Sequence, residues 1–307
     1  MLVNPKENLI RARREGWALG GFNVFNFESA RAVVDAAEQS AAPVLLQTSE
    51  GAVKHAGLDN LVAMVRQLAG RTKTPVALHL DHGKSEALAR AAVDAGYTSV
   101  MIDASRESFD ENLRETRAIV AYAHARGVHV EAELGTLGGI EDLGEEAVRS
   151  MLTDPDQAAR FAAETEVDAL AIAIGTSHGA YKFSGVPRLD FARLEEIAAR
   201  IPQPIVLHGA SSLDAEAVSF AERYGAKLPH AQGVPPELIR KAVSLGVAKV
   251  NTDSDLRLAA LGRLRQVFVE RPEIFNLYEL MGEMEAAIRD AVVARIYMLG
   301  SDGKGQS

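Results

Sequence analysis

The sequence predicts a (β/α)8 TIM barrel with a C-terminal helical extension, and three observations lead to this fold class. Short apolar runs alternate with amphipathic helical segments along the chain, which is typical of a parallel sheet. Eight such units of similar size follow one another, and eight units close this kind of barrel. The length of 307 residues is normal for one barrel. We therefore expect residues 1–307 to form a single domain.

The first four units occupy the N-terminal part of the chain, after a charged, helix-like start. Runs such as Val-Ala-Leu-His-Leu are apolar at almost every step, as expected of strands that are buried on both faces. Strands are expected at 20–24, 43–47, 75–79 and 99–103. Amphipathic segments predict helices at 27–39, 58–69, 84–95 and 109–126.

The last four units continue the alternation. Strands are expected at 128–134, 169–174, 204–208 and 247–250. Helices are expected at 156–164, 191–200, 215–223, 236–245 and 255–270. A doubly wound open sheet is the alternative, but no G-x-G-x-x-G motif opens a helix after the first strand.

Three stretches fall outside the repeat. Residues 135–149 form a long acidic segment in which Gly138 and Gly139 could act as a hinge, and we expect a mobile lid there. Residues 226–236 insert after the seventh strand. Helices at about 271–299 form the C-terminal extension, and the short tail after Gly300 is expected to be disordered.

The composition excludes several function classes. Cysteine is absent, which removes disulfides, thiolate catalysis and Cys-based zinc sites. The net charge of −9 argues against general nucleic-acid binding. No apolar stretch approaches the roughly 20 residues that cross a bilayer, and the N-terminus has no signal-peptide core. We expect a cytoplasmic protein that contacts neither nucleic acid nor membrane.

Polar side chains follow the predicted strands at their C-terminal ends, where the catalytic residues of β/α barrels lie. The third strand ends on an adjacent Asp and His, and other strands deliver more His and acidic residues. The full set is Asn23, Ser49, Asp81, His82, Asp103, Glu131, Glu133, His178, His208, Asn251 and Asp253. Such a concentration of histidines and carboxylates at one rim predicts an active site.

Three histidines of this set follow the third, sixth and seventh strands: His82, His178 and His208. Any one of them alone is more often a hydrogen-bonded histidine than a ligand. Together they form a plausible three-nitrogen site, and a catalytic Zn²⁺ or Co²⁺ takes three protein ligands while keeping one position open. His79 fits either a supporting role at this site or plain packing.

The carboxylates suggest further roles. Asp81 could exchange a proton with a substrate, and Asp103 could orient a metal ligand. Glu131 and Glu133 lie two apart on one strand, so their side chains point the same way and could both face the barrel mouth. For Glu141, on the predicted lid, spacing alone favours a solvated acidic loop.

Two loops could bind phosphate, since barrels often do so after strands seven and eight. They read Gly209-Ala-Ser-Ser212 and Asn251-Thr-Asp-Ser254, and both offer hydroxyls and accessible amides. Gly179 adds a third point of close approach. The alternative is ordinary helix N-capping by Ser and Asp.

Six ordered motifs now resemble one known family. They are HLDH at 79–82, VMIDAS at 100–105, VEAELG at 130–135, GTSHG at 175–179, LHGAS at 207–211 and KVNTD at 249–253. These motifs resemble the class II, metal-dependent fructose-1,6-bisphosphate aldolases, in the shorter subtype that also includes tagatose-bisphosphate aldolases. The resemblance covers nearly the whole chain.

The resemblance implies reversible cleavage of fructose 1,6-bisphosphate to dihydroxyacetone phosphate and glyceraldehyde 3-phosphate, in glycolysis and gluconeogenesis. It implies that Asp81 exchanges a proton at the C4 oxygen and that Glu141 handles the C3 proton. The metal residues it implies are His82, His178 and His208, with Asp103 and Glu133 close by. The substrate and phosphate residues it implies are Asn23, Ser49, Gly179, Lys182, Gly209, Ser211, Asn251, Asp253, Ser254 and Arg257.

The implied cofactor is Zn²⁺ or Co²⁺, with a monovalent cation (K⁺, Na⁺ or NH₄⁺) bound near Gly179 and Gly209. By analogy we expect a homodimer or homotetramer. One departure concerns the family's Asp-x-Arg near the C-terminal helices, where this chain has Asn276-Leu-Tyr278. That departure leaves tagatose-1,6-bisphosphate aldolase as an alternative. A metal-dependent barrel hydrolase and a non-catalytic sugar-phosphate binder are more remote alternatives.

A Schiff-base aldolase would instead need a reactive lysine at a strand end. The predicted strand ends supply none, since Lys249 lies inside a strand run and Lys182 falls in a loop. The residues therefore favour metal-dependent chemistry over a covalent lysine mechanism.

Overall fold

Eight parallel strands close into a barrel in the computed structural model, which describes residues 1–139, 150–178, 188–228 and 231–305. Around the barrel the strand order is β1-β10-β9-β7-β5-β4-β3-β2. The strands are β1 (Leu19–Asn23), β2 (Val44–Thr48), β3 (Val76–Gly83), β4 (Ser99–Ile102), β5 (His129–Leu134), β7 (Ala169–Ile172), β9 (Ile205–Leu207) and β10 (Val247–Thr252). The predicted fold class is confirmed.

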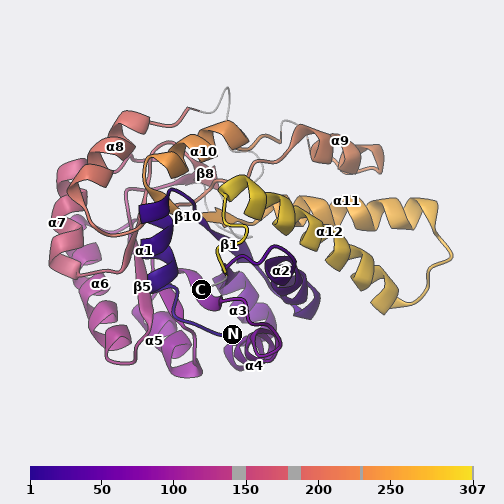
Figure 1. Ribbon diagram of the computed structural model, residues 1–307, viewed down its shortest axis with the longest axis horizontal. Coiled ribbons are helices and arrows are strands. Elements are labelled where there is room, and N and C mark those ends of the chain that lie inside the picture. The colour runs from indigo at the N-terminus through magenta and orange to yellow at the C-terminus, as the bar shows by residue number, and fades with distance from the viewer. Residues whose placement is uncertain (140–149, 179–187, 229–230, 306–307) are drawn as a thin grey trace.

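Helices surround the barrel and connect its strands (Figure 1). They are α1 (Lys6–Glu15), α2 (Phe27–Gln39), α3 (Glu50–Ala56), α4 (Leu58–Ala69), α5 (Glu86–Ala95), α6 (Phe109–His124), α7 (Pro155–Thr165), α8 (Phe191–Arg200), α9 (Ala215–Arg223), α10 (Pro236–Ser244), α11 (Ser254–Glu270) and α12 (Leu277–Leu299). The bounds of α2, α4, α8 and α9 are those that the sequence predicts. Side-chain caps fix several starts, such as Asn26 and Ser29 in a capping box before α2.

The N-terminal helix α1 closes one end of the barrel. Its Leu9 and Ala12, together with Trp17, belong to one buried cluster with side chains inside the barrel, including Leu45 and Val206. Met1 adds to this closure, since its ammonium donates to the carbonyl oxygens of Thr72 and Thr74 at 2.8 and 2.9 Å. Access to the interior is therefore left to the opposite end, where the carboxyl ends of the strands lie.

The C-terminal extension is the single helix α12, which lies beside α11; the two project together from the barrel (Figure 1). Its buried residues recur every three or four positions, at Met284, Ile288, Val292, Ile296 and Leu299. This spacing places them on one face of the helix, as packing onto the barrel requires.

Two described segments differ from the sequence-based expectation. Helix α3 was not predicted, because it has only seven residues, contains Gly51 and is followed directly by Gly57. The two glycines expected to act as a hinge form β6 (Gly138–Gly139), which pairs with β8 (Ser177–His178). The rest of the expected lid, 140–149, lies outside the described residues.

The prediction of a disordered tail is wrong for residues 301–305. Ser301 is buried, and the amide groups of Gly303 and Gly305 donate to the carbonyl oxygens of Ser40 and Ala41 at 2.9 and 2.7 Å. These backbone bonds, which composition cannot reveal, hold the tail against the turn between α2 and β2. None of the helices that the structure describes is long and apolar enough to cross a membrane.

Candidate active site

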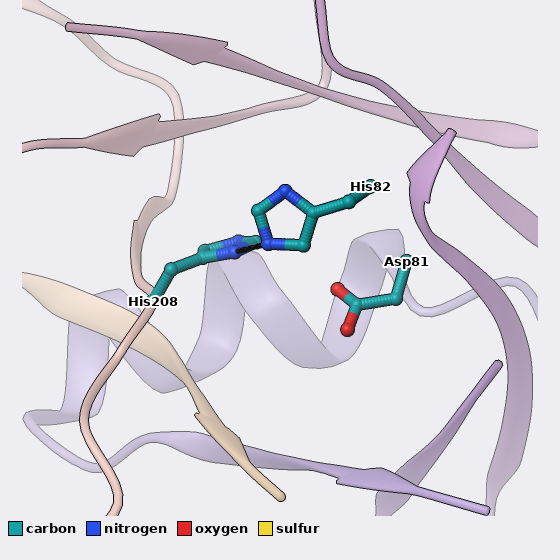
Figure 2. A group of neighbouring side chains, drawn as sticks. All are labelled: Asp81, His82 and His208. Atoms are coloured by element: carbon teal, nitrogen blue, oxygen red, sulfur yellow. Dashed lines mark hydrogen bonds between the residues drawn. The ribbon is translucent and has the colours of Figure 1, made fainter. Parts of the chain in front are cut away.

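An irregularity in β3 aims two neighbouring side chains into the barrel mouth. The register of β3 against β4 shifts between Leu80 and Gly83, and His82 has a φ of 47°. In a regular strand, consecutive side chains point to opposite faces. A bulge changes this alternation, and a non-glycine residue at positive φ costs free energy, which is a pattern found at functional sites. Here it lets Asp81 and His82 share one site, as Figure 2 shows.

His82 and His208 approach each other from opposite sides of the mouth (Figure 2). The distance from His82 Nε2 to His208 Nδ1 is 2.6 Å, and both residues are buried. Ligand-type atoms of Asp81, His82 and His208 all lie within 4.8 Å of one another. Two of the predicted histidines and the predicted acid/base residue are therefore brought together.

Carboxylates hold the outer nitrogen of each of these two rings. His82 Nδ1 lies 2.7 Å from Asp103 Oδ2, and His208 Nε2 lies 2.8 Å from Glu131 Oε1. A carboxylate accepts hydrogen bonds, so each of these nitrogens carries the ring's proton. In the neutral rings the facing nitrogens are then both bases, with lone pairs aimed at one point. Such an arrangement suits a cation bound between them.

The ionisation states favour metal binding at these rings. Burial, followed by the charge of His82, lowers the pKa of His208, and the neutral imidazole is the form that coordinates metals. Burial alone would raise the pKa of Asp81, but the charges that His82 and His208 carry when they are protonated in acid, together with Lys249, lower it to about 2. Asp81 is therefore an ionised carboxylate at neutral pH, and a bound cation would act in the same direction.

Amides from two other strands hold Asp81. Asn23 Nδ2 donates to one carboxylate oxygen at 2.9 Å, and Asn251 Nδ2 donates to the other at 3.0 Å. Gln47 Nε2 in turn donates to Asn23 Oδ1 at 3.1 Å. Gly21 leaves the room for this chain, since a Cβ there would lie 2.0 Å from Gln47 Oε1. The carboxylate is thus fixed before any substrate arrives.

A fully buried ion pair lies beneath the histidines. Glu131 Oε2 accepts from Lys249 Nζ at 2.7 Å, and both side chains are 0% exposed. Lys249 Nζ also lies 3.3 Å from His79 Nε2, and His79 Nδ1 lies 2.7 Å from Ser99 Oγ. The Lys249 charge and the His208 hydrogen bond hold the pKa of Glu131 well below its usual value, although burial opposes them. Glu131 therefore remains an anion that orients His208.

Glu133 faces the same mouth, as predicted from its spacing to Glu131. Its Oε2 lies 3.8 Å from His82 Nδ1, and it forms with His82 and Asp103 a second group that could hold a metal ion. Asn112 Nδ2 of α6 donates to the carbonyl oxygen of Glu133 at 2.8 Å. Because Asp103 is already bonded to the ring proton of His82, its geometry is that of an orienting residue.

The two predicted phosphate loops contact each other. Ser211 Oγ accepts from the amide of Asp253 at 3.2 Å. Gly209 has a φ of 60°, and a Cβ there would lie 2.6 Å from the carbonyl oxygen of Ser177, so only glycine fits this approach. Helix α11 begins at Ser254, directly after Asp253. A helix start beside two small-residue loops is a suitable anion site.

A cavity of about 730 Å³ opens beside these loops. Four predicted substrate residues line it: Asn23, Ser49, Asp253 and Arg257. Ser49 also caps α3, so the capping alternative applies to this residue as well. Arg257 is largely exposed and pairs with Asp253, with 2.9 Å from Nε to Oδ1. The cavity wall further includes Glu50, Lys54, His55 and Lys84.

Comparisons with known proteins agree with this geometry. The model of the family described as "Fructose-bisphosphate aldolase class-II" matches residues 3–304. The chain belongs to the class II fructose-bisphosphate aldolase family. It is 46% identical over 305 residues to a fructose-bisphosphate aldolase of Thermus caldophilus, covering 99% of this chain and 100% of that protein. It is 44% identical to that of Helicobacter pylori, again with 99% and 100% coverage.

A solved structure is similar across its full length. The YdjI aldolase of Escherichia coli K12 superimposes with a TM-score of 0.81 at 31% identity, and the match covers 100% of both chains. Class II aldolases depend on a metal ion, and the two facing imidazoles with Asp103 and Glu131 behind them fit one. The chain is accordingly a lyase of the aldolase type that acts on a sugar bisphosphate.

Several family residues fall outside the described part of the chain. They are Glu141, Gly179, Lys182 and the side chain of His178. The backbone of His178 lies in β8, where it pairs with Gly139 of β6. The family's Asp-x-Arg position, Asn276-Leu-Tyr278, lies at the start of α12, and Leu277 and Tyr278 are exposed there.

Sequence reasoning missed three residues that support the site: Gln47, Lys249 and Arg295. Gln47 gave one signal, a polar residue inside an apolar strand opposite Asn23 of β1. For Lys249 the only prediction was that it does not act as a Schiff-base nucleophile. The structure agrees, because its ammonium is buried against Glu131. Arg295 gave no signal within its long helix.

Proposed function

We propose that this chain cleaves fructose 1,6-bisphosphate reversibly to dihydroxyacetone phosphate and glyceraldehyde 3-phosphate, using Zn²⁺ or Co²⁺. His82 holds the metal through Nε2 and His208 through Nδ1, and His178 supplies the third nitrogen. Asp103 and Glu131 keep the rings in the required tautomer. The observation that carries this proposal is the pair of facing imidazole nitrogens, 2.6 Å apart, with a carboxylate bonded to each opposite nitrogen.

The chemistry requires one base and one stabiliser of negative charge. Breaking the C3–C4 bond leaves an enediolate, and a metal ion held by these histidines would supply the Lewis acid that stabilises its charge. Asp81 accepts the proton of the C4 hydroxyl, and its two amide donors, Asn23 and Asn251, keep it oriented for that transfer. Glu141 returns a proton to C3. We propose that Glu133 approaches the metal in some states of the reaction.

The two ends of the substrate need separate anion sites. Gly179, Lys182, Gly209, Ser211, Asn251, Asp253 and Ser254 form the site for the triose phosphate. Asn23 and Ser49 make further substrate contacts, and Arg257 reaches the second phosphate. All three line one cavity together with Asp253, which supports one shared ligand there. A monovalent cation (K⁺, Na⁺ or NH₄⁺) binds near Gly179 and Gly209.

The setting of the enzyme is also a proposal. We place it in the cytoplasm, in glycolysis and gluconeogenesis, as a single-domain subunit of a homodimer or homotetramer. The exposed apolar residues on α11 and α12, such as Phe268 and Leu277, support an assembly through these helices. The relatives are named as fructose-bisphosphate aldolases, so the tagatose alternative is not favoured.

A coupled assay tests the proposal. Cleavage of fructose 1,6-bisphosphate and of tagatose 1,6-bisphosphate is measured before and after EDTA treatment, and again after Zn²⁺ or Co²⁺ is added back. We expect the fructose sugar to be preferred, activity to be lost with the metal, and activity to return on its addition. Full activity after verified metal removal would overturn the histidine site.

A further inference from the structure

One buried cation on the C-terminal helix lies directly against the loops assigned to phosphate. Arg295 of α12 is 6% exposed, although arginine is rarely buried without a specific partner. Burial lowers the pKa of its guanidinium, while the charge of Asp255 opposes that shift.

The guanidinium bonds to both loops at once. Its Nη1 donates to Ser212 Oγ at 2.7 Å and its Nη2 to the carbonyl oxygen of Ala210 at 3.1 Å, in the loop after β9. Its Nε donates to Thr252 Oγ1 at 3.3 Å, at the end of β10. Each of the three nitrogens is therefore engaged by a loop or strand-end oxygen.

Asp255 completes the bridge from the other side. Its carboxylate accepts from the amides of Ser212 and Leu213 at 3.0 and 2.6 Å and lies 3.7 Å from Arg295 Nη1. Asp255 sits in the first turn of α11, directly after the second loop. The loop after β9 is thus bonded to Asp255 of α11 and to Arg295 of α12. The bonded residues, Ala210, Ser212 and Leu213, flank Ser211.

We propose that Arg295 is a positioning residue for phosphate binding, which sets the spacing between the loops that carry Ser211 and Asp253. The residues that would touch the anion are Ser211, Asp253 and Ser254, so this inference rests on the proposed function. A direct phosphate ligand would direct its N–H groups at the anion. Arg295 instead directs three of its five N–H groups to Ala210, Ser212 and Thr252, and its Nη1 also lies 3.7 Å from Asp255.

The packing of α12 fixes where Arg295 lies along the loops. The apolar stripe from Met284 to Leu299 is buried. A shift of α12 along its axis would take these side chains out of the core, so the stripe sets the position of the helix without help from its surface ion pairs. The C-terminal helix therefore acts as a rigid support for the phosphate loops, in addition to any part in assembly.

Inorganic phosphate is a suitable probe, because its binding does not require a loaded metal site. Its affinity is measured by calorimetry for the wild type, Arg295→Met and Arg295→Lys, together with KM and kcat for aldol cleavage. Arg31→Met is the matched control, because it makes the same substitution at an arginine that contacts α12 and neither loop. Ser212→Ala is a second route, removing one acceptor without altering α12.

We expect phosphate affinity to fall about ten-fold or more in Arg295→Met, with KM rising by a similar factor. The phosphate affinity of Arg295→Lys should fall almost as far, because one ammonium group cannot reach all three acceptors. Arg31→Met should keep the wild-type affinity, even if it melts at a lower temperature.

Wild-type phosphate affinity and KM in Arg295→Met would overturn the inference and leave the aldolase assignment standing. Equal losses in Arg31→Met and Arg295→Met would also overturn it, because they would indicate general destabilisation. If Arg295→Met does not fold, Ser212→Ala is the deciding variant. We expect it to lose a measurable part of the phosphate affinity, and an unchanged affinity would refute the inference. Absence of aldolase activity in the wild type would instead contradict the proposed function.

Discussion

Replacing Lys249 by Met should be among the most destabilising single changes in this barrel. The Lys249 Nζ to Glu131 Oε2 distance is 2.7 Å and neither side chain is exposed. At an effective dielectric constant of about 20, the attraction at that distance is about 6 kcal/mol, before desolvation is subtracted. Removing one partner of such a pair leaves an uncompensated buried charge and costs about 3–5 kcal/mol. We expect Lys249→Met to lose stability in that range.

The assay is equilibrium urea unfolding with EDTA present, so that metal affinity does not contribute. The double variant Glu131→Gln/Lys249→Met removes both charges, while the carbonyl of the introduced amide can still accept from His208. We expect it to recover at least about 2 kcal/mol of the loss. The matched control is Lys6→Met. Lys6 makes a bond of 2.8 Å to Asp168 but is half exposed, and such pairs contribute about 1 kcal/mol or less.

Two results would refute this reasoning. One is a loss below about 1 kcal/mol in Lys249→Met, which would mean that Glu131 is not charged in the folded state. The other is a double variant whose loss of stability equals the sum of the losses in Glu131→Gln and Lys249→Met, which would mean that the two groups do not interact.

The remaining predictions concern the base, its support and the pH dependence. Asp81→Asn should lower kcat about 10²–10⁴-fold in the coupled assay while the metal content by elemental analysis stays unchanged, and near-normal kcat would contradict the role of Asp81. Gly21→Ala should lower kcat/KM at least about ten-fold, because a Cβ there displaces Gln47 from the Asn23 amide; the control Gly282→Ala, with nothing within 4 Å, should not. Burial lowers the pKa of His129 from 6.5 to about 4, so the unfolded chain binds a proton between these values that the folded chain does not. Stability should therefore fall as pH falls through that window, by about 3 kcal/mol at most from this group; urea midpoints for His129→Gln should show a shallower pH slope, and an unchanged slope would contradict the assignment.

The strands and the rim residues could be predicted because one physical rule produces both. A parallel strand is buried on both faces, so it reads as an apolar run, and the first polar residues after it lie at the rim. Asp81, His208 and Asn251 were found this way, and the structure brings them together. The rule says nothing about local backbone irregularity. The bulge that turns His82 into the mouth left only one weak sign, Gly83 directly after it, and a glycine there fits a plain strand end equally well.

The supporting residues could not be predicted, because their partners are distant in sequence and their roles depend on barrel closure. Lys249 and Glu131 are 118 positions apart and lie on β10 and β5, which are not neighbours in the sheet. From the sequence, Lys249 is a charged residue inside a buried strand, and Glu131 is one of the residues expected at the barrel mouth. Only the closed barrel places both side chains in one small interior, where a buried charge needs a partner of opposite charge. Arg295 is a comparable case. An arginine within a helix is expected to be exposed to solvent, but the packing of α12 places Arg295 where it bonds to two loops. Sequence patterns thus locate the groups that face the substrate, whereas the groups that hold them follow from three-dimensional closure.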